Sequence, residues 1–278
     1  MGIFDYNAYE GKLDQLKGAY RSAECFPHGV FDNFIDAGAI NQAVREFPGP
    51  KDDGWVYYVH YNEKKRALRE LKATPAPLRG IIEEFNSPRF VRFLSELTGI
   101  PNLIPDPSLE GGGLHEMDRG GFLNLHADFT AHPHHRMWRR RVNVLLYLNP
   151  DWKEEYGGQL ELWTKDMQRC FEKIVPVLNR CVIFNTDSES FHGHPAPLAC
   201  PDTTTRKSIA LYYFTEETTP PLKVATNYQA RPGDGFKALF IYLDNKILSL
   251  YNYLKGVLGI NDGAVSALLK KLSEKNKS

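Results

Sequence analysis

The stretch GGFLNLHAD, residues 120–128, decides the fold of this chain. Gly120-Gly121 is a turn signal, and the residues after it alternate as in a β-strand. His126 and Asp128 stand two apart at the end of that strand, so both side chains leave the same face. An imidazole and a carboxylate placed side by side have the geometry of two adjacent metal ligands.

A third candidate ligand lies further along the chain. His192 occurs in SFHGHP (190–195), which follows the apolar strand CVIF (181–184) after a short turn. Two histidines and one carboxylate form a facial triad, which leaves positions open on one side of the metal and is typical of non-haem Fe(II) oxygenases. An HxD pair alone is weak support, because such pairs also hydrogen-bond in surface loops.

The strand that follows supplies a candidate anion site. In RKSIALYYF (206–214), Arg206, Ser208 and Ala210 share one face, where the small side chains leave room for a ligand. A guanidinium holds a carboxylate through two parallel hydrogen bonds, which a lysine ammonium does not. Since Lys207 lies on the other, apolar face, we expect Arg206 to be the carboxylate anchor.

A second long strand is predicted over RVNVLLYL, residues 141–148. Its alternation gives an apolar face and a more polar face suited to lining a pocket. The apolar face consists of Val142, Val144, Leu146 and Leu148, and the polar face consists of Arg141, Asn143, Leu145 and Tyr147.

Five segments in order resemble the Fe(II)/2-oxoglutarate-dependent dioxygenases, specifically the prolyl 4-hydroxylase-like branch. They are HAD (126–128), YLNPDW (147–152), GGQLELW (157–163), FHGHP (191–195) and TRKSIALYYF (205–214). The resemblance covers about residues 111–215. It implies an α+β fold whose core is a double-stranded β-helix, the jelly-roll or cupin-like barrel, with an N-terminal helical scaffold and C-terminal helices.

The resemblance also implies how the site is built. Iron would be held inside the barrel by His126, Asp128 and His192. Of the two histidines in the FHGHP segment, the family pattern favours His192 over His194, because the ligand stands directly after Phe191.

Further residues are expected to contact the cosubstrate. The resemblance implies that Arg206 binds the distal carboxylate of 2-oxoglutarate, that Tyr147 assists it, and that Leu160 lines the pocket. Ser208 shares the face of Arg206, and Asn124 shares the face of His126, so both are added as candidate contacts.

The implied cofactors are Fe(II), 2-oxoglutarate and O2, with ascorbate as an optional addition. The implied reaction hydroxylates an unactivated C–H bond of a prolyl residue, an amino acid or a small natural-product intermediate, with release of succinate and CO2. Relatives that halogenate lack the carboxylate ligand, so Asp128 favours hydroxylation, although desaturation and cyclisation remain open. Two alternatives are a non-enzymatic metal-containing binding module and a zinc-dependent hydrolase.

Composition and patterning complete the outline. The 278 residues are 42% hydrophobic and 24% charged, with 34 basic and 34 acidic residues, so no nucleic-acid partner is expected. We expect a helical and strand scaffold over 1–110, the catalytic core over 111–220, and a linker with a helical pair over 221–278. That pair, with apolar patterns over 240–257 and after residue 261, packs on the core or forms an oligomer contact.

The chain shows neither an apolar run long enough to span a bilayer nor a secretory signal, and its four cysteines form no CxxC pair. A cytoplasmic protein is therefore expected. Two features stay open: which of His115 and Glu116 faces the pocket, and whether one arginine of the basic run 136–141 faces the substrate. The cluster AHPHH (131–135) is interpreted as a loop rather than a second metal site.

Overall fold

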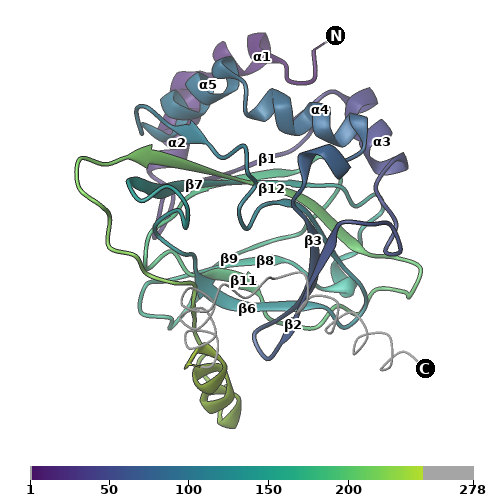
Figure 1. Cartoon of the computed structure of the whole chain (residues 1–278), viewed down its shortest axis with the longest axis vertical. Coiled ribbons are helices and arrows are strands. Elements are labelled where there is room, and N and C mark those ends of the chain that lie inside the picture. The colour runs from purple at the N-terminus through teal and green to yellow at the C-terminus, as the bar shows by residue number, and fades with distance from the viewer. Residues whose placement is uncertain (1, 247–278) are drawn as a thin grey trace.

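The computed structural model of the chain describes residues 2–246. Its first hundred residues contain most of the helices (Figure 1). These are α1 (Tyr6–Glu10), α2 (Leu13–Arg21), α3 (Ala37–Arg45), the short 3-10 helix η1 (Leu71–Ala73), α4 (Ala76–Phe85) and α5 (Pro88–Thr98). A further 3-10 helix, η2 (Glu154–Tyr156), and a helix over residues 236–246 follow later.

The strands run through the whole described chain. The N-terminal part contributes β1 (His28–Phe31), β2 (Trp55–His60), β3 (Glu63–Leu68) and β4 (Ile104–Pro105). The rest are β5 (Gly113–Met117), β6 (Phe122–Ala127), β7 (Trp138–Tyr147), β8 (Leu160–Trp163), β9 (Cys170–Ile174), β10 (Cys181–Asn185), β11 (His192–His194), β12 (Arg206–Glu216) and β13 (Asn227–Tyr228).

The strands form one folded sheet in the order β1-β10-β7-β12-β5-β3-β6-β11-β8-β9. One edge of strand β3 pairs with β2 along its whole length; the other edge pairs with β6 at residues 63–64 and with β5 at residues 66–68, so β3 joins two layers. Figure 1 shows β1, β7 and β12 in one layer, with β6, β8, β9 and β11 in the layer below. This arrangement confirms the predicted jelly-roll core with its α+β surroundings.

The helices cover the outer face of the upper layer (Figure 1). The alternation predicted for residues 141–148 explains this packing, because Val142, Val144 and Leu146 join Phe85 and Phe90 of the helices in one apolar core. The opposite face of β7 looks into the space between the layers. Burial of the helix faces against the sheet is the main term that holds the scaffold in place.

Apolar residues recur with helical spacing over residues 76–98, where the chain forms two helices, α4 and α5. Ser87 ends the first pattern and caps α5, its hydroxyl accepting a hydrogen bond from the Phe90 N–H at 3.2 Å. Pro88 occupies the first turn of α5, where its missing N–H costs nothing. Phe85 and Phe90 still stack across the break, with ring centroids 4.5 Å apart.

Two predictions concern membrane-spanning segments and the C-terminal helical pair. In the described part of the chain, no helix is long and apolar enough to cross a membrane. The predicted C-terminal helical pair lies mostly outside the described residues, and only its first turns, over 236–246, fall within them.

Candidate metal centre

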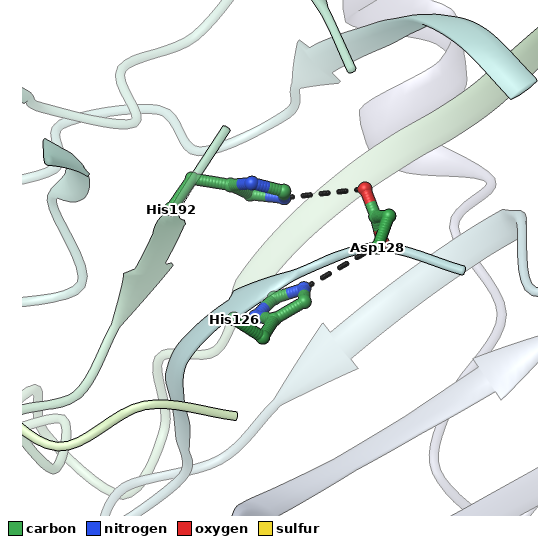
Figure 2. Close-up of side chains that lie close together, drawn as sticks. All are labelled: His126, Asp128 and His192. Atoms are coloured by element: carbon green, nitrogen blue, oxygen red, sulfur yellow. Dashed lines mark ion pairs between the residues drawn. The ribbon is translucent and has the colours of Figure 1, made fainter. Parts of the chain in front are cut away.

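The structure brings the three predicted ligands together between the two layers (Figure 2). His126 is the second-last residue of β6, Asp128 follows it after one residue, and His192 begins β11 directly opposite His126. The Nε2 atom of His126 lies 3.7 Å from Asp128 Oδ1, and that of His192 lies 3.5 Å from Asp128 Oδ2. The candidate ligand atoms all lie within 4.8 Å of one another, and all three side chains are buried.

A β-bulge makes this approach possible. Between His192 and His194, β11 advances two residues while β6 advances three, so His194 pairs with Leu123. Gly193 stands at the bulge, where a Cβ atom would lie 2.9 Å from the carbonyl oxygens of Leu123 and Asn124. The chain therefore needs glycine between the two histidines.

The two histidines are oriented so that Nε2 is free for a metal. The Nδ1 atoms of His126 and His192 each lie 2.9 Å from a backbone carbonyl, of Asn124 and Ser190 respectively. A carbonyl only accepts, so Nδ1 carries the proton and Nε2 keeps its lone pair. Burial, with His126 beside it, lowers the pKa of His192 to about 4, so this imidazole is neutral near pH 7.

Asp128 is held as an ionised ligand by two donors. Arg140 Nη2 and Asn143 Nδ2 lie 3.0 and 2.8 Å from the same oxygen, Oδ2. Burial alone would raise the pKa of Asp128, but the charge of Arg140 and the two neighbouring histidines hold it well below its ordinary value. Two imidazoles and one carboxylate are the donor set expected for Fe(II).

A cavity of about 190 Å³ adjoins the triad. The predicted cosubstrate residues Arg206, Tyr147, Leu160 and Ser208 line it together with the three ligands. Arg206 is buried, and its Nε atom donates to the Gly158 carbonyl at 2.9 Å. Its guanidinium, 5.0 Å from the centre of the Tyr147 ring, has no carboxylate partner among residues 2–246.

The Tyr147 hydroxyl is a second unsatisfied group in this cavity. It is buried and makes no hydrogen bond of standard geometry within the described structure. Burial raises the pKa of Tyr147, although Arg206 lowers it in part, so the hydroxyl keeps its proton and can donate. A buried cation beside a buried hydroxyl donor is an arrangement that an anionic ligand completes.

Two predictions about strand faces need correction. Asn124 does not line the cavity: its Nδ2 atom donates to Tyr61 and Asn62, and the bulge turns Leu123 inward instead. On β7, a register shift between Arg140 and Val142 breaks the alternation, so Arg140 lines the cavity and Arg141 does not. A single period-two pattern cannot foresee a bulge.

The structure resolves the open pair on β5. His115 lines the cavity, and burial with the nearby Lys65 charge lowers its pKa to about 3. Glu116 points away and pairs with Arg66, with 2.7 Å between Nη2 and Oε2. His194 also lines the cavity, but it does not belong to the group of ligand atoms found around Asp128 in the described residues.

The sequence analysis missed one side of the cavity wall. Glu63 and Lys65 of β3 form a 2.8 Å ion pair there, and Tyr228 of β13 places its ring 5.4 Å from that of His126. Glu63 and Lys65 stand two apart on one strand, a signal that could have marked them as sharing a face. Tyr228 lies in a two-residue strand within a polar linker and carried no such signal.

The histidine-rich loop supports itself without a metal. His132 Nδ1 accepts hydrogen bonds from the backbone N–H groups of His134 and His135, each at 3.1 Å. Within residues 2–246, the triad is the group of side chains that could hold a metal ion.

Comparison with known proteins identifies the core. Residues 112–214 match the sequence model of the 2OG-Fe(II) oxygenase superfamily. Those residues belong to that superfamily. Its members use Fe(II), 2-oxoglutarate and O2, and the triad, the unpaired Arg206 guanidinium and the free Tyr147 hydroxyl fit these groups.

Relatives of this oxygenase domain include prolyl hydroxylases. Prolyl 3-hydroxylase OGFOD1 from Mus musculus is 30% identical over 202 residues, which cover 70% of this chain and 34% of the relative. The chain thus spans about a third of the length of that relative. A Pseudomonas putida prolyl-4-hydroxylase matches with a TM-score of 0.52 and 15% identity, covering 74% of this chain and all of that one.

A second solved structure supports the same fold. A prolyl 4-hydroxylase from Phytophthora capsici matches with a TM-score of 0.51 and 18% identity, covering 80% of this chain and 69% of that chain.

Proposed function

We propose that this protein is an Fe(II)- and 2-oxoglutarate-dependent dioxygenase that hydroxylates an unactivated C–H bond and releases succinate and CO2. One observation carries the proposal: the buried Arg206 guanidinium, which has no acidic partner among residues 2–246, faces the same cavity as a buried triad of two histidines and an aspartate. A module that keeps the metal only as a structural clip would have no use for that cation, which is costly to bury unpaired.

The proposal gives each residue a task. His126, Asp128 and His192 hold Fe(II), which supplies the oxidising chemistry once cosubstrate and O2 are bound. Arg206 binds the distal carboxylate of 2-oxoglutarate through its paired N–H groups, and the Tyr147 hydroxyl donates to the same carboxylate. Ser208 and Leu160 shape the wall beside it.

Arg140 and Asn143 fix the carboxylate of Asp128 in this scheme. Because both donate to Oδ2, the other oxygen, Oδ1, is left for the metal. The Arg140 guanidinium also stacks 3.4 Å from the centre of the Tyr212 ring, which immobilises it in the cavity wall.

We propose a prolyl residue within a polypeptide as the substrate. The support is the likeness to proteins named prolyl 3-hydroxylase and prolyl-4-hydroxylase. Aromatic rings of Phe129, Tyr212 and Tyr228 line the cavity and suit an apolar ring as the reacting group. A free amino acid or a small natural product is the competing substrate class.

The proposal also includes the bounds of the domains, the role of the C-terminal region and the cellular compartment. We place the catalytic core at residues 111–220, between an N-terminal scaffold (1–110) and the C-terminal region (221–278), whose helical pattern we propose packs on the core or forms an oligomer contact. A reducing, cytoplasmic compartment agrees with four free cysteines: Cys25, Cys170, Cys181 and Cys200.

Turnover in the presence of O2 tests the function. Fe(II)-loaded protein with 2-oxoglutarate and a pool of proline-containing peptides should form succinate, and the modified peptide should gain the mass of one oxygen atom. Free L-proline serves as the matched small substrate. The proposal would be overturned if folded, iron-loaded protein formed no succinate with the peptides, with free L-proline or in the absence of any substrate.

A further inference from the structure

The helix over residues 236–246 lies outside the segment that matches the superfamily and is drawn below β6 in Figure 1. Near the end of its described part, Asp244 points back into the protein. Its Oδ2 atom lies 2.8 Å from His60 Nδ1 and accepts a hydrogen bond from Asn62 Nδ2 at 2.6 Å. The Asp244 side chain is only 11% exposed, so this is a buried anchor rather than a surface contact.

From Asp244 a continuous chain of hydrogen bonds leads to the triad. Asn62 accepts twice from Asn124: at its Oδ1 atom from Asn124 Nδ2 (3.0 Å) and at its carbonyl from the Asn124 N–H (2.8 Å). The Asn124 carbonyl in turn accepts from His126 Nδ1 at 2.9 Å. Asn62 and Asn124 are almost fully buried, so each bond is sheltered from water.

A second route starts at the next residue of the same helix. Asn245 Nδ2 donates to the Tyr228 carbonyl at 2.8 Å. Tyr228 is the partner of His126 in the pairing of β13 with β6, and its ring lies 5.4 Å from the imidazole. The helix is therefore linked to His126 in two ways. One is the chain of hydrogen bonds that ends at the Nδ1 atom of the imidazole, and the other is β13, the strand that pairs with β6 at His126.

We propose that Asp244 and Asn245 are positioning residues for the metal ligand His126. The inference rests on the proposed iron site. Hydrogen-bond partners beyond the ligands fix the tautomer and orientation of a ligating histidine, and their loss weakens metal binding. Asp244 does this through Asn62, whose Nδ2 atom would otherwise keep, among the described residues, only its longer 3.4 Å bond to the Ile241 carbonyl.

The dissociation constant for Co(II), used as a visible-light probe of the triad, tests this role. Asp244→Ala should weaken Co(II) binding by about tenfold, the low end for an outer-shell residue, and alter the Co(II) absorption spectrum. Asn62→Ala should have the same effect. Because both residues act in one chain, the double variant should bind no more weakly than Asn62→Ala.

A matched control uses Asp234, which lies two residues before the start of the same helix. Asp234 contacts Arg231 and does not line the cavity, so Asp234→Ala should leave Co(II) binding within twofold of wild type. If Asp244→Ala fails to fold, Asn245→Ala breaks the second route and should weaken binding several-fold. Wild-type affinity and spectrum in Asn62→Ala and Asn245→Ala would overturn the inference.

Four further outcomes separate the positioning role from the proposed iron site and reaction. Equal weakening in Asp234→Ala, or additive effects in the double variant, would indicate general loosening and overturn the positioning role. Wild-type protein that binds no Co(II) would instead contradict the iron site itself, whereas wild type that binds Co(II) but not 2-oxoglutarate would contradict only the proposed reaction.

Discussion

Replacing Arg206 with methionine should move cosubstrate binding and protein stability in opposite directions. The guanidinium is buried and has no acidic partner in the described structure, so the ligand-free protein bears the cost of desolvating it. Burial accordingly lowers the pKa of Arg206, although an arginine stays charged. Methionine fills similar space without a charge.

The magnitudes follow from the contacts. Losing two charge-assisted hydrogen bonds to a carboxylate costs about 3 kcal/mol or more, so the Kd for 2-oxoglutarate should rise by at least about 100-fold. In the metal-free, ligand-free protein, an unpaired buried ion costs several kcal/mol, and the bond to Gly158 returns about 2 kcal/mol of that. The variant should thus be about 1 kcal/mol more stable, with Tm raised by about 3 °C.

Calorimetric titration with 2-oxoglutarate and thermal unfolding of the ligand-free protein measure the two effects. Arg206→Lys is the matched control, since it keeps the buried charge but loses the planar fork; it should bind about tenfold more weakly and gain no stability. An Arg206→Met variant that binds 2-oxoglutarate as tightly as wild type, or that unfolds at a lower temperature, would refute the reasoning.

Three further predictions test other parts of the structure. Gly158→Ala should weaken 2-oxoglutarate binding in titration by about tenfold, because its φ is +73° and a Cβ would lie 3.0 Å from Arg206 Cδ; unchanged affinity would contradict this. Glu116→Gln should lower the free energy of unfolding by about 1 kcal/mol in denaturant titrations, because the buried Arg66 loses one of its two carboxylate partners and keeps Asp118, and should spare 2-oxoglutarate affinity. Burial lowers the pKa of His60, but its two carboxylate partners outweigh this and raise it above 6.5. The stability that His60 contributes is therefore full below pH 6.5 and is lost as pH rises through the raised pKa, so the unfolding difference between wild type and His60→Gln should shrink from pH 6 to pH 9; a growing difference would contradict this assignment.

The sequence predicted best where one local pattern suffices. The alternation along β7 correctly placed Val142 and Val144 on the helices and Asn143 and Tyr147 toward the cavity. The same rule failed at Arg141, where the sheet contains a bulge. A bulge depends on how a strand pairs with its neighbour, so the period-two pattern of one strand cannot predict it.

The sequence predicted the site residues that stand in the motifs of the core but not the residues that form the far wall of the cavity. His126, Asp128, His192 and Arg206 stand in short motifs and converge as expected. The far wall comes from β3 and β13, strands separated from the motifs by many residues. Their placement is set by long-range pairing, which a single sequence does not reveal.

The central claim is that 2-oxoglutarate binds at Arg206 beside a metal held by the triad. Anaerobic titration of Fe(II)-loaded protein with 2-oxoglutarate tests it through the visible charge-transfer band that appears when the cosubstrate chelates the iron. The account predicts a saturable band in wild type, no band in His126→Ala, and a band only at far higher concentration in Arg206→Met. A folded, iron-loaded wild type without the band, or an Arg206→Met variant that saturates like wild type, would contradict it.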